Sequence, residues 1–408
     1  MNRLHFYLHR NLLLYSISTN SWEQRKLGEV GSVSMCRRIF KEQTSESGDI
    51  PFYKIGTFGG QADAFISEEL FAEYRSKYPY PKEGDILISA SGSIGRTVEF
   101  TGGNEYFQDS NIVWLSHDDR LDNTFLKYFY SVVKWAGIEG STIKRLYNDN
   151  ILHTVISMPS VAEQKKIGAF FKELDHLITL HQRKLDRLKN IKKSMLDKMF
   201  PKDGEVVPEI RFKGFTDAWE QRKLGDVGTT YTGLSGKAKE DFGHGNGKFI
   251  TYMNVFSNSV ASSEMTEPVE IDDRQNKVIS GDVLFTTSSE TPEEVGMSSV
   301  WLEKSENTYL NSFCFGYRPS IVFEPYYLAY MFRSSSVRKK ITFLAQGISR
   351  YNISKNKMMN IEIFVPTMSE QQQVGEYFRK LDHLITLHQR KLDKLKNIKK
   401  SMLDNMFV

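Results

Sequence analysis

The sequence predicts an α/β protein with two globular domains joined by two long antiparallel coiled-coil helices, arranged as a pseudo-twofold internal repeat. A head segment occurs twice, at 22–31 and 219–228, and nine of its ten positions are identical. A tail segment also occurs twice, at 174–200 and 381–407, with 25 of 27 positions identical. The segments between head and tail differ from each other and have the strand-rich, glycine-punctuated composition of mixed domains.

Composition excludes several classes of protein. At roughly 150 residues per domain, a chain of 408 residues suggests two or three domains. The 40% hydrophobic and 25% charged residues exclude a disordered chain. No apolar run approaches the ~18 residues of a membrane span, and neither a signal peptide nor a membrane partner is expected. Two cysteines, Cys36 and Cys314, are too few for a disulfide framework and predict the cytoplasm.

Each tail is expected to form one long helix. Ser160 with Glu163, and Thr367 with Glu370, have the spacing of capping boxes that start helices. About 40 residues without an internal proline follow each box, and their apolar residues recur at steps of three and four. Because such a stripe needs a partner, we expect the two helices to pair. The order of domains and helices along the chain favours antiparallel pairing. The expected core of the pair is Leu177, Ile178, Leu185, Leu188, Ile191, Leu384, Ile385, Leu392, Leu395 and Ile398.

The remaining segments have strand and shorter helix patterns. We expect strands at 86–89, 111–115, 283–287 and 361–365, and amphipathic helices at 121–136 and 324–344. The expected domains are therefore a first globular domain at 1–159, with an atypical extension at 1–20, a first spacer helix at 160–200, a second globular domain at 201–365, with a linker at 201–218, and a second spacer helix at 366–408.

Motifs of common catalytic sites are missing from the sequence. It contains no phosphate-binding Gly-x-x-x-x-Gly-Lys-Ser/Thr motif, no Asn-Pro-Pro-Tyr and no Pro-Asp pair. His176 and His181 are five residues apart, about 140° around a helix, so they cannot share a metal ion. We therefore expect no catalytic residue and no metal ligand. His181 and its copy His388 are expected to be polar residues that set the register of the helix pair.

Basic residues concentrate on the predicted helices. The chain has a net charge of +4, yet residues 174–200 carry +4 and residues 381–407 carry +3, which leaves −3 for the rest. A solvated helix face explains this pattern, and so does a surface for a polyanion or an acidic partner. Opposite the apolar stripe we expect Arg183, Lys184, Arg187, Lys192, Lys193 and their copies.

Several segments together resemble the conserved segments of type I restriction-modification DNA specificity subunits. The resemblance covers nearly the whole chain, in the order target-recognition domain, conserved helix, target-recognition domain, conserved helix. It rests on Trp22-Glu-Gln-Arg-Lys-Leu-Gly-Glu-Val, Gly84-Asp-Ile-Leu-Ile-Ser-Ala-Ser-Gly-Ser-Ile-Gly, Gly347-Ile-Ser-Arg-Tyr-Asn-Ile-Ser, Ile361-Glu-Ile-Phe-Val-Pro-Thr-Met-Ser-Glu-Gln, Leu381-Asp-His-Leu-Ile and Lys391-Leu-Asp-Lys-Leu-Lys.

The resemblance implies a DNA-binding subunit that is not itself an enzyme. Each target-recognition domain would read one half of a gapped, asymmetric site on double-stranded DNA. The helices would space the domains and bind two methyltransferase (modification) subunits, which restriction/translocase subunits would join. The assembled complex would be an adenine DNA methyltransferase and ATP-dependent endonuclease. S-adenosylmethionine, ATP and Mg are implied for the partner subunits and no cofactor for this chain.

Two segments depart from the family pattern. Residues 1–20 do not look like 207–215, the segment that precedes the second head, and residues 288–296 replace a shorter loop at 91–96. A coiled-coil protein-interaction adaptor without DNA readout is the alternative function, and a stand-alone DNA enzyme is a third that the missing motifs disfavour.

Clusters of basic, amide and aromatic residues supply the candidate DNA contacts. Such side chains bind phosphates and base edges. The candidates in the first domain are Arg96, Lys144, Arg145 and Tyr147, and those in the second are Lys237, Lys248, Arg350, Tyr351 and Asn352.

Overall fold

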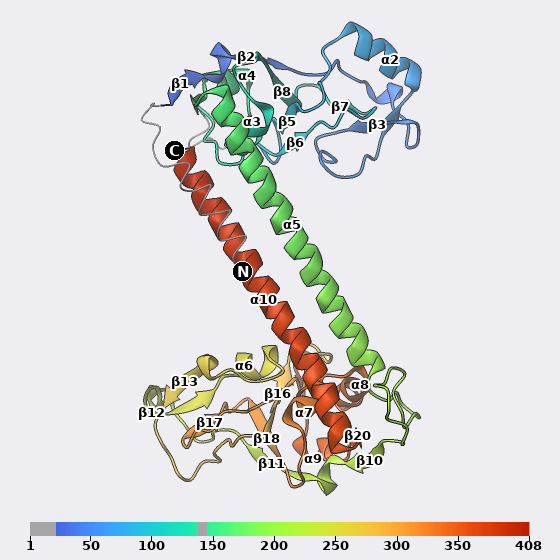
Figure 1. Cartoon of the computed structure of the whole chain (residues 1–408), viewed down its shortest axis with the longest axis vertical. Helices are drawn as coiled ribbons and strands as arrows, with labels where there is room; N and C mark the ends of the chain where they lie inside the picture. The colour runs from blue at the N-terminus through green and yellow to red at the C-terminus, as the bar shows by residue number, and fades with distance from the viewer. Residues whose placement is uncertain (1–21, 138–144, 408) are drawn as a thin grey trace. The chain divides into compact units, whose positions relative to one another are not determined.

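The structure is a computed structural model that describes residues 22–137 and 145–407. It divides into two compact units, one formed by Met1–Leu180 with Leu392–Val408 and the other by His181–Lys391. Both units contain part of each of the two long helices, α5 (Val161–Lys198) and α10 (Met368–Met406) (Figure 1). A globular domain and the adjoining helix segments make up each unit.

Two small sheets build the globular domain of the first unit. The strand order β2-β8-β5-β6 is antiparallel, and the order β4-β3-β7 contains a parallel pair, β3 with β7. The head strand β1 pairs with β9, which leads into α5. Helix α2 packs on the smaller sheet, where Phe71 contacts Tyr106. The elements are β1 (Glu23–Lys26), β2 (Gly31–Ser34), β3 (Ile50–Tyr53), β4 (Phe65–Ile66), α2 (Glu68–Lys77), β5 (Ile86–Ser89), β6 (Thr97–Glu99), β7 (Tyr106–Phe107), β8 (Ile112–His117), α3 (Asn123–Tyr130), α4 (Asn148–His153) and β9 (Val155–Met158).

The second unit repeats this plan. Its sheets have the orders β11-β18-β14-β16 and β13-β12-β17, and its head strand β10 pairs with β20. A short extra pair joins β15 to β19. The elements are β10 (Glu220–Lys223), β11 (Gly228–Thr232), β12 (Phe242–Ile250), α6 (Tyr252–Ser257), β13 (Thr266–Val269), β14 (Val283–Thr286), β15 (Ser288–Ser289), β16 (Ser298–Val300), β17 (Thr308–Leu310), β18 (Cys314–Pro319), α7 (Pro325–Met331), α8 (Ser335–Phe343), β19 (Tyr351–Asn352), α9 (Lys355–Met358) and β20 (Glu362–Val365).

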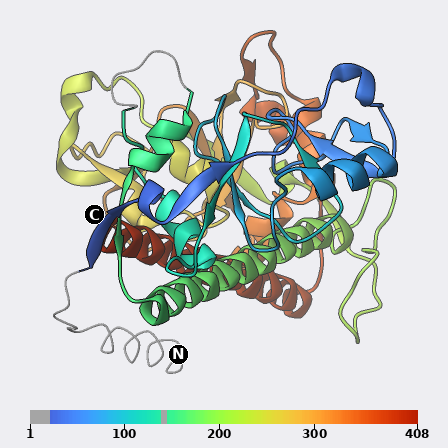
Figure 2. The same cartoon turned by 90° about the horizontal axis from the view of Figure 1, so that it is seen from above.

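The long helices run antiparallel within each unit. In the first unit Phe171 of α5 contacts Phe407, just after α10, and Asp175 pairs with Lys399. In the second, His181 contacts His388, and Phe200 after α5 contacts Phe378. In both units, a later position on α5 meets an earlier position on α10, and Figure 2 shows the two helices next to each other. The predicted fold class, two globular domains with two long antiparallel helices in an internal repeat, is confirmed.

The end of each long helix packs into an aromatic socket of a globular domain. Phe407 lies among Trp22, Phe125 and Phe171, with ring centroids 5.1 to 6.4 Å apart. Its copy Phe200 lies among Trp219, Tyr327 and Phe378, at 5.8 to 6.1 Å. Burying these rings against each other drives the docking of helix on domain. The helix that starts from one domain therefore completes the core of the other.

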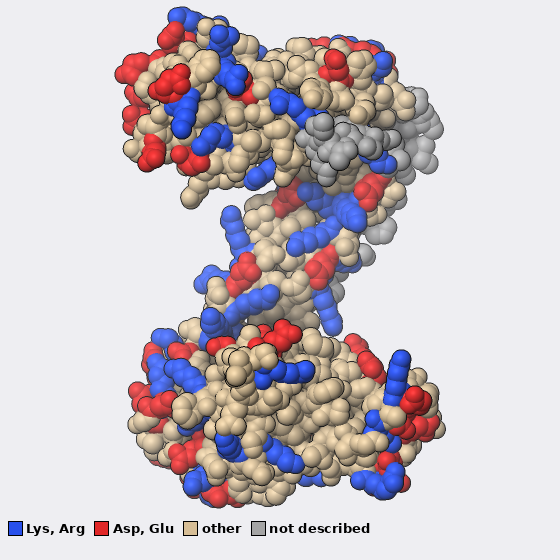
Figure 3. All heavy atoms as spheres, turned by 180° about the vertical axis from the view of Figure 1, so that it is seen from behind, with Lys and Arg blue, Asp and Glu red and all other residues tan. Residues whose placement is uncertain are grey.

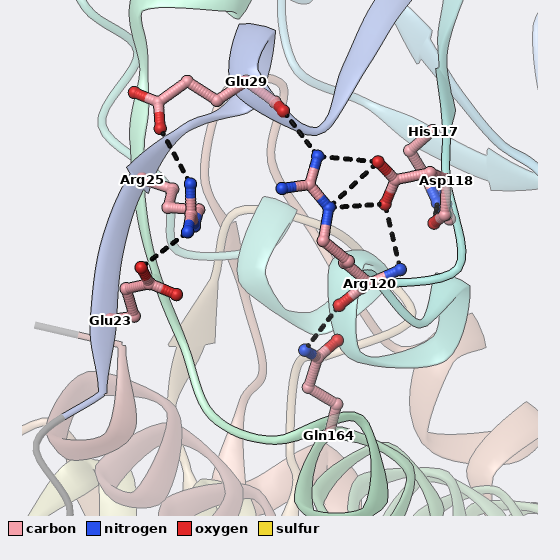
Figure 4. A network of polar contacts seen from close by, with 7 residues as sticks. All are labelled: Glu23, Arg25, Glu29, His117, Asp118, Arg120 and Gln164. Atoms are coloured by element: carbon pink, nitrogen blue, oxygen red, sulfur yellow. Dashed lines mark hydrogen bonds and ion pairs between the residues drawn. The ribbon is translucent and has the colours of Figure 1, made fainter.

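A glutamine at the start of each long helix holds the helix to its domain. Gln164 accepts a hydrogen bond from the Asp122 amide (2.9 Å) and donates to the carbonyls of Arg120 and Pro159. Arg120 in turn binds Asp118 and the Glu29 carbonyl, so the head, the β8 end and α5 form one network (Figure 4). The hydrogen bonds from Arg120 lower the pKa of Asp118 to about 2.

Gln371 repeats part of this arrangement in the second unit. It accepts from the Glu324 amide (3.0 Å) and donates to the Pro366 carbonyl (3.0 Å). Both glutamines are buried, so each satisfies backbone groups that would otherwise lack a partner at the helix start.

Two of the expected shorter helices differ from the prediction. The segment 121–136 is helical only at α3, where Asp122 caps the start and the Ser131 hydroxyl donates to the Tyr128 carbonyl near the end. The segment 324–344 is broken into α7 and α8. Arg333 lies at the break, where it donates hydrogen bonds to the carbonyls of Ser298, Val255, Phe256 and Asn258. We attribute the break in the helix to these hydrogen bonds, which pair partly buried carbonyls of two other segments.

None of the helices in the described part of the chain has the length and apolar character that a membrane span requires.

Candidate nucleic-acid interface

A tight polar loop follows the buried strand β5 in the first unit. Gly92 and Gly95 have φ of +67° and +78°, which glycine adopts without strain. Ser89 donates to the Ser93 carbonyl and accepts from the Arg96 amide, which closes the loop on itself. Arg96 ends the loop with an exposed side chain, and its Nη2 donates to the Gly59 carbonyl (3.3 Å).

Arg145 and Tyr147 lie along the same loop. A β-bridge joins Ser91 to Arg145, and the Leu146 amide donates to the Ala90 carbonyl (2.8 Å). The Arg145 guanidinium donates to the Ser110 carbonyl (3.1 Å) and lies 5.9 Å from the Tyr147 ring. Tyr147 is 58% exposed. The structure thus brings Arg96, Arg145 and Tyr147 to one loop, whereas Lys144 lies outside the described residues.

The second unit places Arg350, Tyr351 and Asn352 at the matching position. The Ile353 amide donates to the Thr287 carbonyl (2.9 Å), as the Leu146 amide does to Ala90. Tyr351 and Asn352 form β19, which pairs with β15 after the buried strand β14. The same backbone contact therefore presents a different set of side chains in each domain.

A closed loop carries Arg350. Gln346 and Asn352 exchange two backbone hydrogen bonds of 2.9 and 2.8 Å, and Gly347 makes the turn at a φ of +147°. Arg350 Nε donates to the Ser288 hydroxyl (3.2 Å), and its guanidinium lies 6.0 Å from the Phe313 ring. The arginine is exposed but held, so binding of a ligand by its guanidinium would cost less side-chain entropy than binding by a free arginine.

Lys237 and Lys248 do not join this cluster. Lys237 forms an ion pair with Asp272 (3.2 Å), and its side chain is only 11% exposed. Hydrogen bonds from Arg274 and Lys237 lower the pKa of Asp272. Lys248 is exposed on β12, between β13 and β17. The charge of Lys237 is thus paired within its domain, and the DNA contacts expected of Lys237 and Lys248 stay predictions.

Sequence reasoning missed the residues that hold the candidates in place. Phe313, 57% exposed, supports Arg350, and Ser288 accepts its hydrogen bond. Arg338 donates to the carbonyls of Glu293, Val295 and Gly296 and so orders the loop specific to the second domain. Burial lowers the pKa of Arg338 to about 10, so it stays charged at neutral pH. One of these residues could have been found from the sequence, because a serine follows a buried strand in both copies, as Ser91 after β5 and as Ser288 after β14.

Most residues of the predicted helix core are buried or partly buried. Leu185, Leu392 and Leu395 are buried, and Leu177, Ile178, Leu188, Ile191, Ile385 and Ile398 are partly buried. Leu384 differs from the prediction, because it is 40% exposed. It lies on the flank of the stripe that Leu381, Ile385 and His388 form, since a step of three residues from Leu381 falls short of a full helical turn.

His181 and His388 face each other across the helix pair, with their Nδ1 atoms 2.9 Å apart. One ring must therefore donate a proton that the other accepts. Burial lowers the pKa of both rings, and the charges of Lys184 and Lys391 lower it further. This polar pair suits the expected role of setting register.

The basic face of the helices is mostly as expected. Arg183, Lys184, Arg187 and Lys193 are exposed, and Figure 3 shows Lys and Arg side chains projecting from the helices. Lys192 differs, because it forms an ion pair with Asp382 and its side chain is only 21% exposed. Within residues 22–137 and 145–407, no three His, Cys, Asp or Glu side chains form a group that could hold a metal ion.

Comparison with known proteins relates both halves of the chain to one family. A model of the type I restriction modification DNA specificity domain matches residues 19–190 and 216–397. A putative type I restriction enzyme specificity subunit of Haemophilus influenzae is 59% identical over 153 residues, which span 37% of this chain and 40% of that protein. A putative specificity subunit of Methanocaldococcus jannaschii is 22% identical over 438 residues, 98% of this chain and 96% of that one.

Solved structures show the same fold. The S subunit of a type I restriction-modification system from M. genitalium aligns with a TM-score of 0.54 at 13% identity and covers 96% of this chain and 98% of its own.

Proposed function

This chain belongs to the family of type I restriction-modification DNA specificity proteins, and on that premise we propose that each of its two recognition domains reads one half of a gapped, asymmetric DNA site. Membership of the family assigns the chain to sequence recognition and not to catalysis. The observation that carries the proposal is the equivalent backbone contact in the two domains, Leu146 to Ala90 and Ile353 to Thr287. This contact supports two DNA-reading domains that hold their loops in the same way but present different side chains.

The candidate contacts have the chemistry that DNA readout requires. Arg96 and Arg145 border one loop beside an exposed tyrosine, and Arg350 and Asn352 border the other beside an exposed phenylalanine. Guanidinium and amide groups recognise guanine and adenine edges in the major groove, and the same groups bind phosphates. Hydrogen-bond donors that are fixed in place in this way suit direct contacts with bases better than non-specific electrostatic attraction to the DNA backbone.

The helices would dock two methyltransferase subunits, which the restriction/translocase subunits would join. Leu180 and Leu384 support this, since they are large apolar side chains of the two helices that stay exposed. The partner subunits would hold S-adenosylmethionine, ATP and Mg, and the complex would modify and cleave DNA in the cytoplasm. Glutamate at both leucines is expected to weaken assembly with the methyltransferase, as measured by sedimentation of the mixed subunits.

A domain exchange tests the reader proposal. Residues 22–158 would be replaced by those of a relative, and the methylated motif would be determined by sequencing the DNA of cells that carry the complex. We expect one half of the motif to change and the other to stay. If neither half of the motif changes, the reader proposal fails. Absent or salt-independent DNA binding by the complex would instead support the alternative of a protein-interaction adaptor without DNA readout.

A point substitution tests the second domain. Arg350→Ala in the assembled complex is expected to cost ~1 to 3 kcal/mol at the second half-site and to leave the first half-site unchanged. Arg274→Ala is the control, because Arg274 is an exposed arginine of the same domain that pairs with Asp272. An unchanged affinity for the second half-site in the Arg350 variant would remove Arg350 from the reading surface.

A further inference from the structure

One carboxylate of each long helix joins three elements. In the first unit, Asp175 of α5 binds Lys399 of α10 through Oδ1 (2.5 Å). Its Oδ2 accepts a hydrogen bond from the hydroxyl of Tyr128 on α3 (2.9 Å). The Lys399 ammonium also lies 5.3 Å from the Tyr128 ring, within reach of a cation–π interaction. The three side chains thus connect a recognition domain with both helices.

The second unit contains a copy of this triad. Asp382 of α10 binds Lys192 of α5 (2.5 Å) and accepts from the Tyr330 hydroxyl on α7 (2.8 Å). The Lys192 ammonium lies 5.3 Å from the Tyr330 ring. The Ser259 hydroxyl adds a further hydrogen bond to Asp382 (3.2 Å). Both triads take the aspartate from one helix and the lysine from the other.

The geometry of the triads is closely defined. Each lysine is only 21 to 24% exposed, and each aspartate uses its two oxygens for different elements. Burial and the nearby carboxylate raise the pKa of both tyrosines, so each hydroxyl keeps the proton that it donates. A carboxylate whose oxygens bind groups on two other elements allows neither of them to slide or rotate freely.

Stability alone does not explain these contacts. A partly exposed ion pair contributes little to the free energy of folding, and the aromatic sockets around Phe200 and Phe407 already attach each helix end to a domain. Rings can slip against each other, whereas a carboxylate shared between a lysine and a tyrosine specifies one arrangement. Retained polar contacts of this kind are best known for fixing register.

We propose that the Tyr128–Asp175–Lys399 and Tyr330–Asp382–Lys192 triads are positioning elements that fix the pose of each recognition domain on the helix pair and thereby select the number of base pairs between the two half-sites. This inference rests on the proposed function. One base pair changes the separation of the half-sites by about 3.4 Å and their rotation by about 34°. Only a closely held pose can reject such a neighbouring spacing.

The test measures selectivity for spacing in the full complex. Methylation rates would be compared on DNA duplexes that carry the two half-sites at the native spacing and at one base pair more or less. The variants are Lys192→Met, which removes the ion pair and the cation–π contact, and Tyr330→Phe, which removes only the hydroxyl. We expect the ratio of native to non-native rates to fall at least tenfold in Lys192→Met and by a smaller factor in Tyr330→Phe.

Two controls separate positioning from stability. Lys192→Arg keeps the charge and is expected to retain most of the spacing selectivity. Lys198→Met removes another ion pair of α5, with Glu209 (2.7 Å), and should leave the ratio unchanged. A purely structural role would reduce the yield of complex but not the ratio.

An unchanged ratio in a folded complex of either triad variant would overturn the proposal, as would an equal fall in Lys198→Met. If Lys192→Met does not fold, Tyr330→Phe decides, because it retains the ring. Failure of the proposed function looks different, since methylation would then be insensitive to the sequence of both half-sites at every spacing.

Discussion

Replacing Arg211 by methionine is expected to destabilise the second unit strongly. Arg211, in the segment before the second head, donates from Nε and Nη2 to both oxygens of Glu370 at 2.7 and 2.8 Å. Glu370 is 1% exposed, and Trp219 Nε1 donates a third hydrogen bond to it (3.1 Å). Removing one partner of a buried ion pair costs ~3 to 5 kcal/mol because the other charge stays buried. Since Trp219 remains bound, we expect ~3 kcal/mol.

Urea denaturation of the full chain measures this cost. With a slope of ~2 to 3 kcal/mol per molar urea, the midpoint for the second unit should fall by about 1 M. Glu163 occupies the same position in the first copy and is only partly buried, so Glu163→Gln serves as control and should change stability by less than ~0.5 kcal/mol. The double variant Arg211→Met with Glu370→Leu should recover most of the loss, because no charge is then stranded.

Equal shifts for Arg211→Met and Glu163→Gln would refute this reasoning. So would a double variant less stable than Arg211→Met, because the cost would then come from lost packing and not from a buried charge.

Three further predictions concern the helix pair and the reading loop. Leu185→Ala should cost ~2 to 5 kcal/mol in urea denaturation, because Leu185 is 1% exposed, while Leu384→Ala should cost less than ~1 kcal/mol. The lowered pKa values of His181 and His388 mean that the folded state binds fewer protons than the unfolded state. The contribution of the two neutral rings to the free energy of unfolding is therefore fully present above the unfolded pKa of ~6.5, and it is lost as pH falls through the folded pKa. Urea midpoints between pH 7.5 and 5 should show this slope, and replacing both rings by glutamine should flatten it. Gly347→Ala should weaken methylation at sites that depend on the second half-site and should also lower the urea midpoint, because its Cβ would lie 2.0 Å from the Arg350 carbonyl oxygen, a backbone atom, and the loop would have to shift.

The repeat made the fold largely predictable. Two near-identical tails with capping boxes predict α5 and α10, which begin at Val161 and Met368, and the glutamate amides bind Ser160 and Thr367 as expected. The Glu370 side chain differs from a capping box, because it binds Arg211 and Trp219 instead. A local motif specifies where a helix begins, but tertiary partners decide where a long side chain points.

Pairings between distant residues limit what the sequence reveals about the site. Lys237 looks like any exposed lysine until the fold brings Asp272 to it. Arg350 is held by Ser288 and Phe313, and of these two only Ser288, which follows a buried strand as Ser91 does in the first copy, has a signal in the sequence. The helix predicted at 324–344 breaks because Arg333 serves carbonyls from two other segments. All three depend on contacts that no periodicity encodes.

The end of α10 packs in the first unit and the end of α5 packs in the second. This arrangement sets the order in which the chain can complete its fold. The first unit contains Leu395, Leu403 and Phe407 in or against its core, although its other buried core residues, Leu27 to Leu174, are translated more than 200 residues earlier. The domain that is synthesised first therefore cannot complete its aromatic socket until the last segment of α10 has been synthesised. Contacts between residues so far apart in the sequence form slowly. The second unit has no such delay, because α5 precedes it. A stop codon just before α10 ends would thus damage the amino-terminal reader more than the carboxy-terminal one.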